Sequence, residues 1–172
     1  QQTPPNMVLN GIAIVLTVYI MAPVGMSIAD SLRGRTLGAS GGAVADVIAV
    51  LDAARPPVKE FLAKHTRERE RQFFVKSASQ VWPKARADTV QADDFVVLVP
   101  SFVLSELTRA FQIGFIIYLV FVVVDLIVGT VLLALGMSMM TPTTISLPFK
   151  LLLFVMLDGW ARLVHGLVLS YR

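Results

Sequence analysis

Ionisable side chains interrupt the apolar C-terminal part of this sequence, and they are the residues that could do chemistry there. Asp125 stands in the middle of one apolar stretch, and Lys150 and Asp158 interrupt the next. Because a charge at the centre of a bilayer costs roughly 2.5–3.5 kcal/mol, such groups need partners or water. Arg162 and His165 follow Asp158 by four and seven residues, on one face of a helix. The pattern predicts either ion pairs between packed helices or a path for protons or ions.

Two acids inside apolar segments also raise the idea of an intramembrane aspartyl protease, in which two carboxylates share a proton. Asp125 and Asp158 stand in Val-Val-Asp-Leu and Leu-Asp-Gly-Trp, however, and neither has a Gly-x-Gly-Asp setting. The absence of cysteine excludes thiol catalysis and Cys-ligated metals. His65 and His165 have no partner at metal-ligand spacing, and we take His65 as a helix-surface residue. We therefore expect no enzyme activity, no metal and no cofactor, and we assign no catalytic residue.

A run rich in methionine follows the longest apolar stretch, at Met137, Ser138, Met139 and Met140. Methionine is flexible and fills irregular gaps in a protein core, which gives a structural interpretation of this run. The functional interpretation is a greasy constriction that closes a narrow opening and yields to a passing chain. Composition does not decide between the two.

The charged residues are concentrated in the centre of the chain. Of the 27 charged side chains, 22 lie in residues 30–109, none lies before them and five follow. Apolar residues make up 55% of the 172 and charged residues 16%, against roughly 25% charged in soluble domains. This composition excludes intrinsic disorder and disfavours an ordinary cytosolic enzyme. The net charge of +3 is too small to indicate nucleic acid. We expect a membrane protein with one aqueous region between apolar segments.

The elements that position these residues are predicted to be helices. We expect an apolar helix over 7–28, a polar, mainly helical region over 29–100, a long apolar helix over 101–140 and a C-terminal apolar helix over 145–170. An unbroken helix over 101–140 would be ~60 Å long, twice the ~30 Å of a bilayer core, so we expect it to be bent, split, or only partly inside the membrane. Glu106 and Arg109 lie one turn apart on it and can pair. Pro23 should kink or end the first helix.

Prolines divide the polar region. Pro56 and Pro57 are expected to separate a short helix over 43–54 from an amphipathic helix over 58–76. The apolar run over 95–99 precedes a proline and is compatible with a short strand or a buried extended segment. Ser101 follows this run and is predicted to be the N-cap of the long helix.

Five stretches of the sequence resemble the SctR/FliP family, whose members are core membrane subunits of the type III secretion export apparatus. They are QTPPN (Gln2–Asn6), FLAKHT (Phe61–Thr66), SELTRAFQIGF (Ser105–Phe115), VVDLIVGTVLLALGM (Val123–Met137) and ISLPFKLLLFVMLDGW (Ile145–Trp160). The last two are long and specific, and the resemblance covers most of the chain. FLAKHT and the ending Leu-Ser-Tyr-Arg are more similar to the injectisome branch (SctR) than to the flagellar branch.

The resemblance implies a non-enzymatic structural subunit of the export gate, part of the channel through which unfolded proteins leave the bacterial cytoplasm. It implies an all-α fold in which apolar helices and helical hairpins flank one polar domain and build a multi-subunit cone. Its partners would be further copies of itself (a pentamer in the family), SctS/FliQ-like and SctT/FliR-like membrane subunits, needle or rod components, the exported polypeptide and the membrane. It places the chain in the bacterial inner membrane, with the polar region on the non-cytoplasmic side. Family members begin with a further apolar segment before QTPPN, so we expect native residues upstream.

The resemblance also assigns the methionine run. In the family a methionine-rich loop narrows the export path like a gasket, and it corresponds to Met137, Ser138 and Met139, with Met140 following. Ser138 stands where the family usually has methionine. Val120 stands where the family usually has proline, so a kink expected there should be weaker.

The charges keep two interpretations. Asp125, Lys150, Asp158, Glu106 and Arg109 form buried or inter-subunit contacts, or an ion- or proton-coupled transporter uses Asp125, Lys150 and Asp158. Lys150 and Asp158 are ~12 Å apart along a straight helix and ~80° apart around it, so they should not pair directly. We expect Lys150 to pair with a carboxylate from another helix or subunit, either Asp125 or a copy of Asp158.

Overall fold

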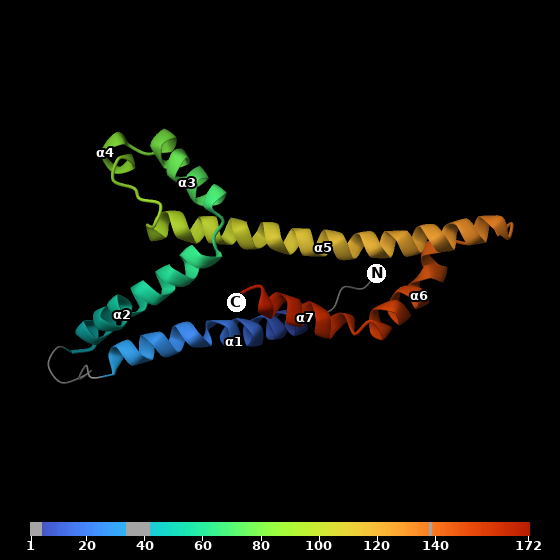
Figure 1. Cartoon of the computed structure of the whole chain (residues 1–172), viewed down its shortest axis with the longest axis horizontal. Helices are drawn as coiled ribbons and strands as arrows, with labels where there is room; N and C mark the ends of the chain where they lie inside the picture. Colours follow the sequence, from blue (N-terminus) through green and yellow to red (C-terminus); the bar gives the residue numbers. More distant parts are fainter. Residues whose placement is uncertain (1–4, 34–41, 138) are drawn as a thin grey trace. The chain divides into compact units, whose positions relative to one another are not determined.

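The computed structural model describes residues 5–33, 42–137 and 139–172, and within these ranges every regular element is a helix. The helices are α1 (Asn6–Leu32), α2 (Gly42–His65), α3 (Glu68–Val81), α4 (Lys84–Ala87), α5 (Phe95–Ala134), α6 (Pro142–Met156) and α7 (Gly159–Leu169). Figure 1 shows them in the order of the chain. The predicted all-α fold is confirmed.

The chain divides into two compact units, residues 1–106 and residues 107–172, with the boundary inside α5. The first unit contains α1 to α4 and the first turns of α5, and α1 packs against α2. The second unit contains the rest of α5 with α6 and α7, and α6 packs against α7. The polar region thus shares its unit with the N-terminal apolar helix.

Among the described residues, two helices, α1 and α5, are long and apolar enough to cross a membrane, and α6 with α7 would count as a third span if the bent pair is taken together. Most of their large apolar side chains are exposed within the chain, and α1 buries no residue. The apolar residues that the structure does bury are Ala53, Leu62, Ala78, Val97, Leu98 and Leu132. Because so much apolar surface cannot remain in water, lipid or other protein chains must cover it. The chain is a membrane protein.

Helix α5 begins at Phe95, so the run over 95–99 is helical and is neither a strand nor an extended segment. Pro100 lies inside the helix and removes one backbone hydrogen bond. Val97 and Leu98 are 2% and 0% exposed. Burying each such side chain is worth about 1.5–3 kcal/mol, so the two together match or exceed the roughly 3 kcal/mol that a proline costs inside a helix. The burial of Val97 and Leu98 therefore compensates for the proline, and the helix continues past Pro100. Helix α5 also continues through Val120 and ends at Ala134, so the helix is not split and ends six residues before the expected residue 140.

The polar region is broken at a place that the prolines did not predict. Helix α2 passes through Pro56 and Pro57 and ends at His65. Arg67 has an extended backbone, and its N–H donates to Ser105 Oγ at 3.0 Å rather than to a helical carbonyl. The expected amphipathic helix over 58–76 is therefore two helices, α2 and α3, because a side chain of α5 takes over one backbone donor at the junction.

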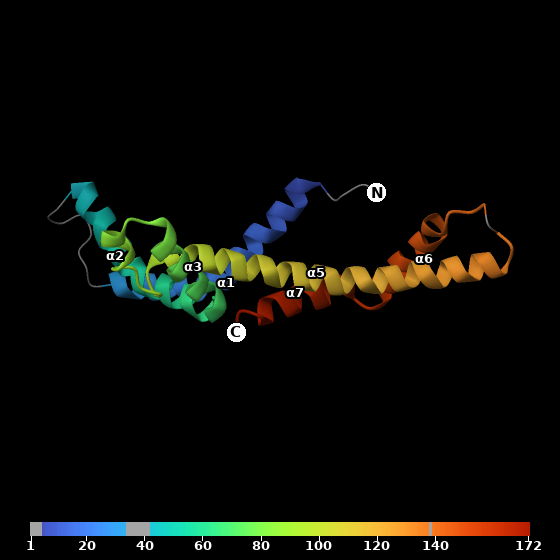
Figure 2. The same cartoon turned by 90° about the horizontal axis from the view of Figure 1, so that it is seen from above.

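The C-terminal apolar segment is also two helices, because α6 ends at Met156 and α7 begins at Gly159 with a bend of 55°. The turn between them is visible in Figures 1 and 2. Asp158 has a left-handed backbone, with φ of 52°, which interrupts a right-handed helix and which aspartate tolerates better than most residues. Helix α1, by contrast, continues past Pro23 to Leu32, so the helix does not end at this proline, and a kink there stays a prediction.

Candidate functional site

A polar cluster joins α5 to α6 within the second unit. Lys150 Nζ donates to Asp125 Oδ2 at 2.6 Å, and Ser146 Oγ donates to the other carboxylate oxygen. Ser146 and Lys150 are four residues apart on α6, so both project from one face of that helix toward the same residue of α5. We call Asp125, Ser146 and Lys150 the α5–α6 clamp.

The clamp is largely withdrawn from solvent. Ser146 is 0% exposed, and the side chains of Lys150 and Asp125 are 18% and 30% exposed. An apolar groove of about 390 Å³ lies between the same two helices and is lined by Val124, Ile127, Val128, Val131, Leu132, Ile145 and Phe149. A paired charge beside such a groove fixes the register of α5 against α6. The expected pairing of Lys150 with a carboxylate is present, and Asp125 supplies it.

Asp158 is not part of the clamp and is exposed. It occupies the exposed turn between α6 and α7, and its carbonyl accepts the Arg162 N–H at 3.0 Å. Gly159 follows, and a Cβ there would lie 2.4 Å from the ring of Phe154. Phe154 in turn contacts Trp160 edge-on, with ring centroids 5.6 Å apart. The Leu-Asp-Gly-Trp motif is therefore a packed turn whose shape depends on the backbone of two residues.

The methionine run forms the connection from α5 to α6. Gly136 ends α5 with φ of 74°, its N–H donates to Leu133 O, and the Met137 N–H donates to Leu132 O, the two bonds of a Schellman motif. Pro142 begins α6 at a position where its missing N–H costs nothing. Both ends of the connection are therefore fixed.

The three described methionines of the run are exposed to different degrees. Met139 is 99% exposed, and Met137 and Met140 are 47% and 45% exposed. Ser138 lies outside the described residues. These three side chains therefore do not fill a core within this chain, which disfavours the structural interpretation of the run.

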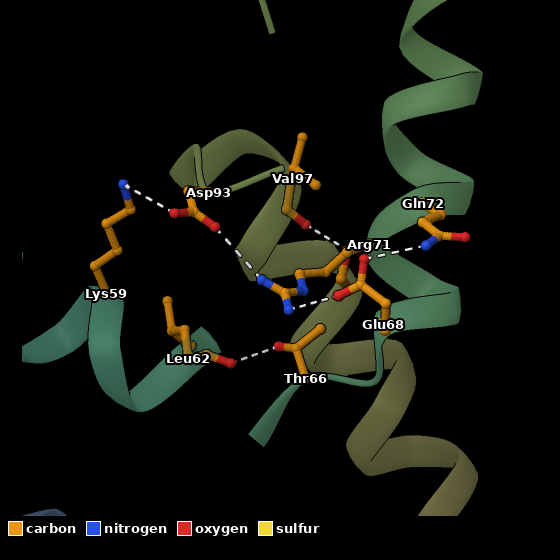
Figure 3. Close-up of polar contacts among 9 residues, drawn as sticks. Lys59, Leu62, Thr66, Glu68, Arg71, Gln72, Asp93 and Val97 are labelled. Carbon is orange, nitrogen blue, oxygen red and sulfur yellow. Dashed lines mark hydrogen bonds and ion pairs between the residues drawn. The ribbon is translucent and has the colours of Figure 1, made fainter. Parts of the chain in front are cut away.

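The first unit has a polar network that fixes α2, α3 and the segment before α5, shown in Figure 3. Arg71 lies between Glu68 at 2.6 Å and Asp93 at 3.4 Å, and Lys59 reaches Asp93 at 3.9 Å. Gln72 Nε2 donates to Glu68 at 3.2 Å. These ion pairs are too exposed to be worth much singly, and their joint effect is to hold three segments together.

Two of the motifs that carry the family resemblance are joined by a hydrogen bond in this unit. The backbone of Arg67, directly after FLAKHT, bonds to Ser105, the first residue of SELTRAFQIGF. Ser101 and Ser105 are 0% exposed, and each hydroxyl donates to the carbonyl four residues earlier. Ser101 is therefore an interior helix residue and not the expected N-cap. His65, expected on the surface, is 7% exposed and lies against Phe61 with ring centroids 4.7 Å apart.

The remaining residues assigned from the sequence are less tightly placed. Glu106 and Arg109 are half-buried, one turn apart on α5. Sequence reasoning missed the roles of Ser105 and Ser146 and gave Ser101 a different role, that of an N-cap. Their signal was a lone serine within an apolar run, and for Ser101 and Ser105 a repeat of four residues. Among the described residues no three His, Asp or Glu side chains gather as a metal site would require.

Taken together, these features define an all-α membrane protein with an internal ion pair between apolar helices. The chain belongs to the FliP family, which it matches over residues 1–167. It is 56% identical over 172 residues to "Pathogenicity-related ORF2" of Xanthomonas campestris pv. glycines, covering all of this chain and 79% of that protein. It is 52% identical to "Hypersensitivity response secretion protein HrcR" of Ralstonia nicotianae, over 100% of this chain and 79% of that protein.

A third relative is "Yop proteins translocation protein R" of Yersinia pestis, 51% identical over 171 residues, which are 99% of this chain and 78% of that protein. The resemblance stated from the sequence motifs is thus confirmed. The function that it implied, a structural subunit of the type III secretion export gate, follows from this membership, and the ion-coupled transporter gains no support.

Proposed function

We propose that several copies of this chain, five by resemblance to the family, surround a path for exported polypeptides. Relatives are named for secretion and translocation, which supports a role in moving proteins. The observation that carries the proposal is the connection between α5 and α6, in which Met139 is 99% exposed between two fixed helix ends. An exposed, unbranched apolar side chain is costly in water and useful as a soft seal.

The assembly also explains the surface of the chain. Large apolar side chains of α1, α5, α6 and α7 are exposed, for example Val15 at 68%, Phe115 at 62% and Trp160 at 61%. We propose that further copies, small SctS/FliQ-like and SctT/FliR-like membrane subunits and lipid cover them, with needle or rod components at the non-cytoplasmic end. The chain would lie in the bacterial inner membrane, with its charged region on the non-cytoplasmic side.

In this proposal each group has a mechanical role. The clamp of Asp125, Ser146 and Lys150 holds α6 at a fixed register on α5, and the Schellman turn at Gly136 sets the direction of the chain as it leaves α5. The methionines Met137, Met139 and Met140 would then project from each copy toward the path. Because the thioether side chain changes rotamer easily, the ring would close on itself and open around a passing chain.

The test is a triple substitution of Met137, Met139 and Met140 by alanine, which removes flexible bulk from the proposed constriction. Cells that carry the assembled variant should leak small solutes, while the amount of complex stays near that of the unchanged chain. The matched control replaces three exposed methionines elsewhere, Met7, Met26 and Met156, whose exposures are 85%, 62% and 76%. If the triple variant assembles and leaks no more than this control, the three methionines do not close the export path.

A further inference from the structure

Helix α7 has two unlike faces, which distinguishes it from the first apolar helix of the chain. At about 100° per residue, Arg162 and His165 lie about 60° apart on one side of α7. Trp160 and Leu167 lie about 20° apart on the side opposite Arg162. Helix α1, by contrast, has no charged residue before Asp30 near its end. Helix α7 is therefore amphipathic, with one basic and one apolar side.

Both sides of α7 are uncovered within the chain. Arg162 and His165 are exposed, and neither forms an ion pair with another described residue. Trp160 is 61% exposed and Leu167 is 37% exposed, and no residue of the helix is buried. Leu169, the last residue of α7, is the one large apolar side chain of the helix on the side of Arg162. The two sides need two different environments, one apolar and one that accepts positive charge.

The direction of α7 and its aromatic residues fit the boundary between lipid and water. Helices α6 and α7 meet at 55°, so the two cannot both lie along the membrane normal. Trp160 lies in the first turn of α7, and Tyr171 follows shortly after its end. Tryptophan and tyrosine concentrate at the level of lipid headgroups, and amphipathic helices with a basic polar face lie in the plane of this boundary.

The charges near α7 favour anionic lipid. From residue 159 to residue 172 the charged residues are Arg162 and Arg172, and both are basic. Asp158, the nearest acid in sequence, lies in the turn before the helix, and its carboxylate forms no ion pair with Arg162. A guanidinium group binds phosphate oxygens through two parallel N–H bonds, and basic side chains at a membrane surface attract anionic headgroups.

From these observations we propose that α7 lies in the plane of the membrane surface, with Trp160 and Leu167 among the acyl chains and with Arg162 and His165 against the phosphates of anionic phospholipids. Helices α6 and α7 then do not form one span, because α7 runs along the surface. This inference goes beyond the export function, since it requires only that the chain is a membrane protein.

A second copy of this chain fits the two sides of α7 less well. It would have to cover the apolar side and also bring carboxylates to the opposite side, whereas the edge of a bilayer supplies both environments at once. In the second unit of another copy the acids are Asp125, which is held in the clamp, and Asp158. All other acids of the chain lie in the first unit, outside the apolar segments that follow residue 109.

The experiment places the photo-reactive residue p-benzoylphenylalanine at position 166 of the full chain, in cells that assemble the complex. Gly166 lies about 40° from Arg162 around α7, and a Cβ there meets nothing within 4 Å, so the larger side chain has room. Illumination should yield adducts with phospholipid, and mass spectrometry should find phosphatidylglycerol or cardiolipin in excess of their share of the membrane. An adduct with a protein in place of lipid, a second copy of the chain included, would overturn the proposal.

Substitutions of Arg162 test whether its charge selects the lipid. Arg162→Gln should lower the excess of anionic lipid about fivefold, the effect expected when one cation is lost beside an anionic surface. Arg162→Lys keeps the charge and should keep most of the excess. The matched control is Arg86→Gln, which removes an exposed arginine of the first unit and should change nothing. An excess that survives in Arg162→Gln, or an equal loss in Arg86→Gln, would contradict the assignment.

A second measurement leaves Arg162 and His165 in place and so does not depend on the assembly of a variant. The complex with the photo-reactive residue at position 166 is placed in nanodiscs that contain equal amounts of phosphatidylcholine and phosphatidylglycerol. Adducts with phosphatidylglycerol should exceed those with phosphatidylcholine about fivefold. Equal yields with the two lipids would show that α7 does not recognise anionic headgroups.

Discussion

Replacing Gly159 by alanine should destabilise the turn between α6 and α7. The added Cβ would lie 2.4 Å from Cε2 and 2.5 Å from Cδ2 of Phe154. Carbon atoms prefer separations of about 3.5–4.0 Å, so the ring must move by about 1 Å or more. The ring is held by Trp160 at a centroid distance of 5.6 Å and by Phe121 at 6.4 Å. Movement therefore disturbs three aromatic side chains and not one.

The magnitude follows from two opposing effects. Forcing extra atoms into a packed site costs about 1–3 kcal/mol. Replacing glycine by alanine in a helix gains up to about 1 kcal/mol, and less at the first residue of a helix, which is the position of Gly159 in α7. The net loss should be about 1–2 kcal/mol. For a chain of this length that corresponds to a decrease in Tm of about 3–6 °C.

Gly166 provides the matched control in the same helix, because a Cβ there meets nothing within 4 Å. Gly166→Ala should keep or slightly raise the Tm. The assay is thermal unfolding of the detergent-solubilised complex, followed by the fluorescence of Trp160 in a Trp82→Phe background that leaves one tryptophan. A second variant, Gly159→Ala with Phe154→Leu, should recover part of the loss because the smaller side chain makes room. If Gly159→Ala and Gly166→Ala melt at the same temperature, the packed turn is not as described.

Three further outcomes are expected. Lys150→Met should reduce assembly on native gels, and adding Asp125→Leu should recover part of it because no charge is left unpaired; a double variant as poor as the single one would contradict the clamp. Asp158→Asn should assemble normally, since asparagine tolerates a left-handed backbone, whereas Asp158→Val should not; loss in the asparagine variant would mean that the charge itself contacts another subunit. Arg86→Cys, the one thiol in a chain without cysteine, should react with an impermeant reagent added outside the cell, and labelling only after the inner membrane is breached would place the polar region on the other side.

The helical class and the first helix were predictable from composition. A stretch of 22 residues without charge specifies an apolar helix over 7–28, and the structure extends it to Asn6–Leu32. The sequence alone predicts that Lys150 has a partner, because the free energy cost of an unpaired charge among apolar residues is high. Its partner was not, since choosing Asp125 over a copy of Asp158 requires the spatial relation of α5 and α6.

The errors arose where contacts distant in sequence override local signals. Pro56 and Pro57 are helix breakers locally, yet α2 continues through them and ends where Ser105 captures the N–H of Arg67. The split at Asp158 had a local signal that sequence reasoning did not use, because Asp158-Gly159 is a dipeptide typical of turns. The burial of His65 likewise depends on the approach of α5, which no periodicity in the sequence encodes.

We propose that several identical copies of this chain together form the export gate. The most direct measurement is the native mass of the complex extracted in mild detergent, with the subunits identified after dissociation. We expect several copies of this chain, five by resemblance, together with small helical membrane proteins. A particle that holds a single copy of the chain, or the chain alone and active without partners, would contradict it.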